Sequence, residues 1–136
     1  MLSWSEIKEM HESGLVTFGA HTVSHPILTR VHIDSAEQEI VLSKRMVEEK
    51  LGAPVTVFCY PNGKSSDFNE EIKNVIQKEG FEAAFTTVEK IPLVMDKLSI
   101  PRYGLVKEPL YLFGLRMMHF FDAVNQMRRK KSAGVQ

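Results

Sequence analysis

The sequence predicts an α/β fold in which short parallel strands alternate with helices. Apolar runs of strand length occupy residues 15–20, 55–60 and 81–86, and a shorter one covers residues 98–101. Segments with helical spacing of their apolar residues lie between these runs. Because the connections are short, consecutive strands should run parallel and be joined by right-handed crossovers. We therefore expect three or four parallel strands.

Capping signals predict where the first two helices begin and end. Ser3 and Glu6 have the spacing of a capping box, which predicts a helix over residues 4–13. Asp34 repeats this spacing with the glutamate three residues later and should open the second helix. Gly52 should end that helix, because glycine tolerates the left-handed conformation of a helix C-terminus.

Two further helices are expected in the second half of the chain. Asp67 and Glu70 should open the third helix, and Gly80 should close it. Its apolar residues are predicted to face the core, and these are Ile72, Val75 and Ile76. The last helix should cover residues 109–130, which are unusually apolar at their start and end in a basic cluster.

Length and composition limit the classes of protein to consider. The chain has 136 residues, whereas a closed barrel of alternating strands and helices needs about 200 or more. We therefore expect a partial (β/α) barrel. Seventeen basic and seventeen acidic residues give no net charge, which argues against nucleic acid as a partner.

The sequence shows no targeting signal and no pair of cysteines. No apolar run approaches the roughly 20 residues of a membrane span. Residues 1–20 do not have the uninterrupted apolar core of a signal peptide. Cys59 is the single cysteine, so no intrachain disulfide can form. The localisation stays open between the bacterial cytoplasm and the envelope.

His21 and His25 form the most informative constellation in the chain. They follow the predicted strand over residues 15–20, at the end where parallel α/β folds place their functional loops. Neutral imidazole is a common ligand of zinc and other first-row metals, and two histidines four apart can share one ion. A bare pair of this kind is more often solvated or hydrogen-bonded. The remaining histidines are expected to be surface or boundary residues, namely His11, His32 and His119.

Four segments together resemble the polysaccharide deacetylases, the family 4 carbohydrate esterases. Residues 19–26, Gly-Ala-His-Thr-Val-Ser-His-Pro, are similar to the family pattern G-x-H-[ST]-x-x-H-P. Residues 58–63 resemble the later F-x-Y-P-x-G pattern, and residues 80–87 and 100–102 resemble further landmarks. The resemblance keeps its order and spacing over about residues 2–105.

The resemblance implies a distorted (β/α) barrel that holds a divalent metal, often zinc, through one aspartate and two histidines. Water on the metal attacks the acetyl amide of an N-acetylated sugar, and a second aspartate accepts the proton. Carried onto this sequence, the metal ligands are His21 and His25. The later pattern implies substrate-binding residues, namely Tyr60, Pro61, Asn62 and Gly63.

The sequence departs from the family in its catalytic carboxylates. The family's aspartate pair precedes its histidine pattern, but residues 1–20 contain no aspartate. The third metal ligand and the base are therefore missing from this chain. Tyr60 stands where many members have an arginine, and Arg102 is a candidate to supply that charge instead. The family's late acid histidine is not recognisable.

These observations favour a polysaccharide deacetylase that removes N-acetyl groups from a carbohydrate polymer, with no activity in this chain by itself. The alternative is a non-catalytic half-domain that binds a carbohydrate or a protein. We expect residues 1–108 to form the partial deacetylase domain and residues 109–136 to form an apolar helix with a basic tail. A partial barrel leaves open strand edges and an uncovered face, so we expect a homodimer to which the terminal helix contributes. The alternative is that the helix over residues 109–126 folds back over the open face.

Overall fold

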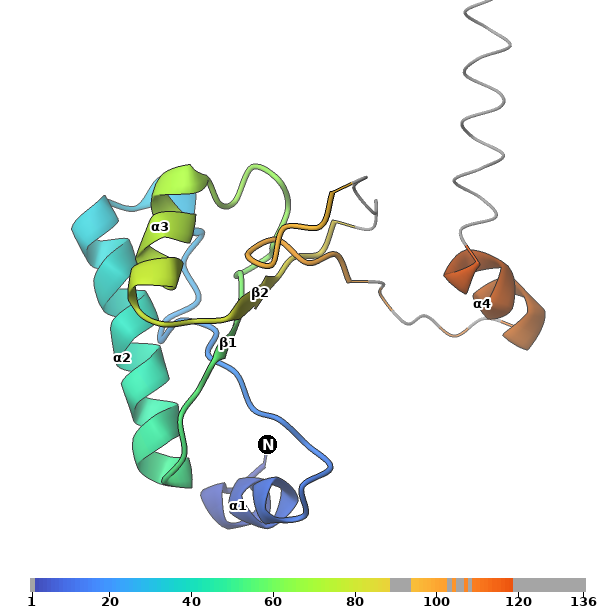
Figure 1. Ribbon diagram of the computed structural model, residues 1–136, viewed down its shortest axis with the longest axis horizontal. Coiled ribbons are helices and arrows are strands. Elements are labelled where there is room, and N and C mark those ends of the chain that lie inside the picture. The colour runs from blue at the N-terminus through green and yellow to red at the C-terminus, as the bar shows by residue number, and fades with distance from the viewer. Residues whose placement is uncertain (1, 89–93, 103, 105–106, 108, 119–136) are drawn as a thin grey trace, which may run out of the picture. The chain divides into compact units, whose positions relative to one another are not determined.

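The chain divides into two compact units, Met1–Tyr103 and Gly104–Gln136. The computed structural model describes residues 2–88, 94–102, 104, 107 and 109–118 (Figure 1). The first unit contains, in order, α1 (Trp4–Glu12), a 3-10 turn (Leu28–Arg30), α2 (Ile33–Leu51), β1 (Val57–Cys59), α3 (Glu70–Lys78) and β2 (Ala83–Phe85). The second unit contains α4 (Leu110–Met117).

The two strands pair in parallel, as the alternating pattern predicted. Phe58 lies opposite Ala84 at the centre of the pair. A single parallel bridge joins Ala20 to Phe58 on the other edge of β1, and another joins Phe85 to Ile100 beyond β2. Four chain segments therefore run parallel side by side, but only the inner two are strands. The α/β class is confirmed, while the described residues do not show a barrel.

The predicted strand over residues 15–20 is reduced to its last residue. Ala20 is fully buried and bridges β1, whereas Leu15 is 89% exposed. Residues 16–19 have no strand partner in the described part of the chain. An apolar run becomes a strand only where another backbone lies beside it, because each strand needs a partner for its hydrogen bonds. The short segment before Pro101 behaves in the same way, with Ile100 alone in a bridge.

Two helices begin at residues other than those predicted. His32 caps α2, and its ring accepts a hydrogen bond from Asp34 N over 3.4 Å. Asn69 caps α3 by accepting from Ile72 N over 3.0 Å. Asp67 is instead buried in the preceding loop, where its carboxylate accepts from the Lys64 backbone. Polar residues close together in sequence compete for the capping position, and the course of the loop decides among them.

The core lies between the strand pair and two helices. Helices α2 and α3 lie side by side and cover one face of the strands (Figure 1). Phe58 of β1 packs edge-to-face against Phe81, with ring centroids 5.4 Å apart. Helices α2 and α3 contribute buried residues to this cluster, as predicted for α3, namely Ala36, Ile40, Ile72, Val75 and Ile76.

Helix α4 is the described part of the predicted terminal helix. It spans eight residues, and residues 119–136 lie outside the described part of the chain. The predictions for His119 and for the basic cluster fall in that range. In the described residues, no helix has both the length and the apolar character to cross a membrane.

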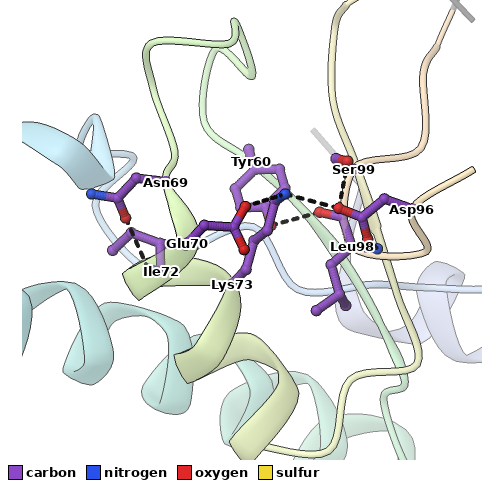
Figure 2. A network of polar contacts seen from close by, with 8 residues as sticks. All are labelled: Tyr60, Asn69, Glu70, Ile72, Lys73, Asp96, Leu98 and Ser99. Carbon is purple, nitrogen blue, oxygen red and sulfur yellow. Dashed lines mark hydrogen bonds and ion pairs between the residues drawn. The ribbon is translucent and has the colours of Figure 1, made fainter. Parts of the chain in front are cut away.

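Tyr60, directly after β1, anchors a polar network that ties three segments together (Figure 2). Its side chain is fully buried, stacks on Phe68 at 4.3 Å between ring centroids, and donates a hydrogen bond to the Leu98 carbonyl over 2.8 Å. Burial raises the pKa of the Tyr60 hydroxyl well above its usual value. The hydroxyl therefore stays protonated and keeps donating to Leu98.

Lys73 and Asp96 complete this network (Figure 2). The Lys73 ammonium lies 2.8 Å from carboxylate oxygens of both Asp96 and Glu70. Asp96 also accepts from Leu98 N and from Ser99 Oγ, over 2.8 and 2.9 Å. The hydrogen bond from Lys73 lowers the pKa of Asp96 and outweighs the opposing effect of partial burial. The network therefore holds the segment before Ile100 against α3.

We predict that Asp96→Asn destabilises the protein at neutral pH by about 1 kcal/mol. The substitution removes the charge that Lys73 pairs with, and the value stays small because the Asp96 side chain is 44% exposed to screening solvent. The pKa of folded Asp96 lies below its ordinary value of 3.8. Its stabilisation is therefore complete above about pH 4 and is lost as the pH falls through the folded value. Urea unfolding at several pH values measures this.

The matched control is Glu12→Gln, which removes a carboxylate from the exposed Lys8–Glu12 pair at 3.9 Å. This control should be almost neutral at every pH. The network has no stabilising role if the two variants unfold at the same urea concentration at pH 7.

Candidate functional site

The two histidines lie on the loop that follows the bridge at Ala20. We call residues 21–25 the histidine loop. Gly19 permits the close approach to β1, since a Cβ there would lie 2.8 Å from the carbonyl oxygen of Val57. His21 then turns its ring toward the end of β1, and its Nδ1 lies 2.7 Å from the Cys59 carbonyl oxygen. A carbonyl can only accept, so Nδ1 carries the proton. The lone pair of His21 is therefore on Nε2 and is available to a metal.

His25 lies beside His21. The centroids of the two rings are 4.9 Å apart, the ring planes are inclined by 74°, and both residues are exposed. As expected from the sequence, the imidazoles lie together at the carboxyl end of the parallel segments. The arrangement leaves both rings accessible from solvent, as a shared ion would require.

The backbone between the rings adopts an unusual conformation. Thr22 has φ 65° and His25 has φ 60°, both in the left-handed region. That region costs non-glycine residues on the order of 1 to 3 kcal/mol each, and a β-branched threonine is especially disfavoured there. Thr22 Oγ1 accepts a hydrogen bond from His25 N over 3.2 Å. This bond compensates part of the cost and turns His25 back toward His21.

Glu39 of α2 holds the middle of the loop, and the sequence reasoning missed it. Its carboxylate accepts from Val23 N over 2.7 Å, from Ser24 N over 2.8 Å and from Ser24 Oγ over 2.6 Å. A signal was present in the sequence. Glu39 occupies a position of the helical stripe that also contains Ala36, Ile40 and Ser43, all of which are buried. A carboxylate among buried positions indicates a specific polar partner.

The hydrogen bonds keep Glu39 ionised. Desolvation raises the pKa of its carboxyl, but the hydrogen bonds from Ser24 and Val23 together outweigh it. The pKa of Glu39 is therefore below its usual value, and the carboxylate is charged at neutral pH. No salt bridge to a lysine or arginine involves this carboxylate in the described part of the chain.

Arg102 lies beside the same stretch of β1. Its Nε donates to the Thr86 carbonyl over 2.9 Å, and its Nη1 lies 3.6 Å from Cys59 Sγ. Cys59 therefore contacts Arg102 through its side chain and His21 through its carbonyl. The structure thus places Arg102 and His21 against the same residue of β1, which the sequence alone did not establish.

The segment over residues 60–63 is mostly internal. Tyr60, Pro61 and Gly63 are buried, and Asn62 is exposed at the tip of the turn. Thr87 fixes this turn by donating from Oγ1 to the Asn62 carbonyl over 2.6 Å and from its backbone N to the Gly63 carbonyl over 2.9 Å. Of the four residues predicted to bind substrate, only Asn62 therefore presents its side chain to solvent. The Tyr60 side chain instead packs inside the protein, where it stacks on Phe68 and donates a hydrogen bond to the Leu98 carbonyl.

The histidine pair fits part of a metal site. Two imidazoles with one Nδ1 fixed by a carbonyl are the ligands that zinc prefers. Across the described residues, no group of three or more histidine, cysteine, aspartate or glutamate side chains could hold a metal ion. The described residues therefore bring two imidazoles together, whereas a zinc site needs at least three protein ligands.

Comparison with known proteins gives a consistent result. Residues 2–84 match the family model for polysaccharide deacetylase. The chain is 27% identical over 86 residues to the putative polysaccharide deacetylase YxkH of Bacillus subtilis (strain 168), and the match covers 63% of this chain and 29% of that protein.

Solved structures show the same relationship. IcaB from Ammonifex degensii superposes with a TM-score of 0.69 at 25% identity, covering 79% of this chain and 49% of that one. BC0361, a polysaccharide deacetylase from Bacillus cereus, gives a TM-score of 0.60 at 29% identity, covering 74% and 31%. The chain thus spans less than half the length of these relatives. The family model covers more than half of the chain and includes the histidine loop, so the chain belongs to the polysaccharide deacetylase family.

Proposed function

We propose that this chain carries the histidine half of a metal-dependent polysaccharide deacetylase site, which removes N-acetyl groups from a carbohydrate polymer. The observation that supports it best is the His21 ring, whose Nδ1 is fixed on the Cys59 carbonyl beside the His25 ring. That geometry leaves the His21 Nε2 lone pair free for an ion.

The proposed ligands are His21 and His25, and zinc is the proposed ion, because neutral imidazole is one of its common ligands. A bound divalent ion would polarise the amide carbonyl and lower the pKa of its water. The chain's other residues would bind and orient the substrate. Arg102 is the proposed charged orienter, because it lies against Cys59, and exposed Asn62 is the proposed polar contact with the sugar.

The third ligand and the general base are not supplied by the described residues. The twenty residues before His21 contain no aspartate, and no third ligating side chain joins the two imidazoles in the described ranges. We therefore propose that this chain by itself binds metal weakly or not at all and does not turn substrate over.

The site is also proposed to lie within residues 1–108, with residues 109–136 forming a separate helix and tail. The division of the chain into units at Tyr103 and Gly104 supports a boundary in this region.

We predict that zinc binds this chain no more tightly than about 10 μM, because two imidazoles leave half of a tetrahedral shell to water. Titration followed by the imidazole resonances should shift the signals of His21 and His25 together. His21→Ala should abolish the shift of His25, since one imidazole cannot hold the ion alone.

The matched control is His11→Ala, which removes an imidazole from α1 and should leave the zinc titration unchanged. Zinc shifts that survive His21→Ala would contradict a site shared by the two rings. Submicromolar binding would instead show that a further ligand completes the site.

We predict no deacetylation by the chain alone. Among the described residues, no carboxylate joins the two imidazoles to accept the proton of the attacking water. Acetate release from N-acetylated chitin oligomers, measured with and without zinc, should equal the release by zinc alone. Turnover that His25→Ala removes would contradict this expectation.

The same oligomers test the alternative of a non-catalytic binding half-domain. The missing third ligand is the observation that favours it. Saturable oligomer binding without acetate release, weakened by Asn62→Ala but unchanged by zinc and by His21→Ala, would support that alternative.

We also propose a homodimer. Leu15 is 89% exposed, and residues 16–19 lack a strand partner within the described ranges, so this edge can pair with a second copy. Sedimentation velocity at low micromolar concentration should give a dimer, and Leu15→Lys should shift it toward monomer. A wild-type monomer at this concentration would contradict the proposal.

A further inference from the structure

The histidine loop has little packing to hold its shape. Val23 is 50% exposed, and the row of residues from His21 to His25 contains no buried member. The loop nevertheless keeps Thr22 and His25 in the left-handed region. A conformation that residues rarely adopt, in a loop without burial, needs specific bonds to persist.

The two rings are fixed by different elements. His21 is fixed directly, since its Nδ1 bonds the Cys59 carbonyl at the end of β1. His25 has no equivalent hydrogen bond from its ring among the described contacts. Its position depends on the path of the backbone from Val23 and Ser24, and both of these residues donate to Glu39.

Glu39 can serve as a fixed reference because α2 is anchored in the core. Ala36 and Ile40 of the same helix are fully buried, and Ser43 one turn later is nearly so. The Glu39 side chain is only partly exposed. Among the described residues, it accepts hydrogen bonds only from Val23 and Ser24 of the loop. The carboxylate thus ties the middle of the loop to a helix that is anchored in the core.

We infer that Glu39 is a positioning residue that sets the placement of the His25 imidazole relative to His21 by holding Val23 and Ser24. It acts through the backbone and does not contact the rings. The inference rests on the proposed function in one respect, since it assigns this placement a use in metal binding.

The structure predicts an asymmetric effect of Glu39→Ala. The nuclear Overhauser effect between the rings of His21 and His25 should be lost, and the amide signals of residues 22–25 should shift. The His21 Nδ1 proton should remain protected by the Cys59 carbonyl. A general loss of stability would instead affect both rings equally.

Two further variants separate charge from geometry. Glu39→Gln should keep most of the ring contact, because an amide oxygen still accepts from the backbone and its NH₂ group can donate to Ser24 Oγ. Glu37→Ala is the matched control on α2, because Glu37 pairs with Lys78 at 2.9 Å and not with the loop. It should leave the ring contact intact.

The outcomes are decisive in each case. Loss of the ring contact in Glu39→Ala with retention in Glu37→Ala supports the inference, and retention in both overturns it. If Glu39→Ala does not fold, Glu39→Met decides, since it keeps a side chain of similar size and removes all three hydrogen bonds to the loop. Amide exchange at residues 23–25 should then accelerate at least several-fold while the core is unchanged, and unchanged exchange overturns the inference.

The zinc titration keeps the two proposals apart. If wild type binds zinc, Glu39→Ala should weaken binding by about 10- to 100-fold, as is typical for residues that orient metal ligands, and Glu39→Gln should have a much smaller effect. If wild type binds no zinc, this chain does not hold the ion by itself, while the ring contact in the metal-free chain still tests the role of Glu39.

Discussion

Strand β1 is hydrogen-bonded along both of its edges, and the rest of the first unit depends on this ladder. Ala20 N donates to Val57 O over 3.0 Å, and Cys59 N donates to Ala20 O over 2.9 Å. Strand β2 pairs with the opposite edge. With Phe58 fully buried between them, a shift of one residue would turn its ring out of the core. The ladder therefore fixes both the core and the point where the histidine loop begins.

The carboxyl end of this ladder lies beside the candidate site. The carbonyl of Cys59 lies at the carboxyl end of β1, and His21 uses it to fix one ring nitrogen. The Cys59 sulfur atom contacts the guanidinium group of Arg102. Parallel strands commonly deliver functional loops at this end, because the loops converge there from neighbouring segments. In this chain the converging elements are the loop after Ala20, the end of β1 and the segment after Ile100.

Two kinds of polar interaction have different consequences in this molecule. The network of Tyr60, Lys73 and Asp96 connects elements that are already packed, so it adds to stability (Figure 2). The Glu39 interaction holds an exposed loop in a strained conformation, so it determines geometry more than stability. Family membership accounts for the histidine pattern, but it does not by itself show how this loop keeps its shape.

The sequence by itself determined the features that depend on neighbouring residues. The capping box at Ser3, the left-handed Gly52 and the buried face of α3 were all predictable, because caps and helical periodicity are local. The pairing of His21 with His25 was predictable from their spacing and the family pattern. The α/β class followed from the order of the elements.

Only the tertiary structure decided the features that depend on distant partners. The segment over residues 15–19 has no strand beside it in the described part of the chain. The Tyr60 hydroxyl can be buried because the Leu98 carbonyl, 38 residues away, accepts its hydrogen bond. Glu39 lies on the buried stripe of its helix, but only the structure shows that its partner is the loop 15 residues earlier. The segments that meet in space decide how long a strand is, whether the Tyr60 hydroxyl is buried and what holds the histidine loop. Local propensity does not contain that information.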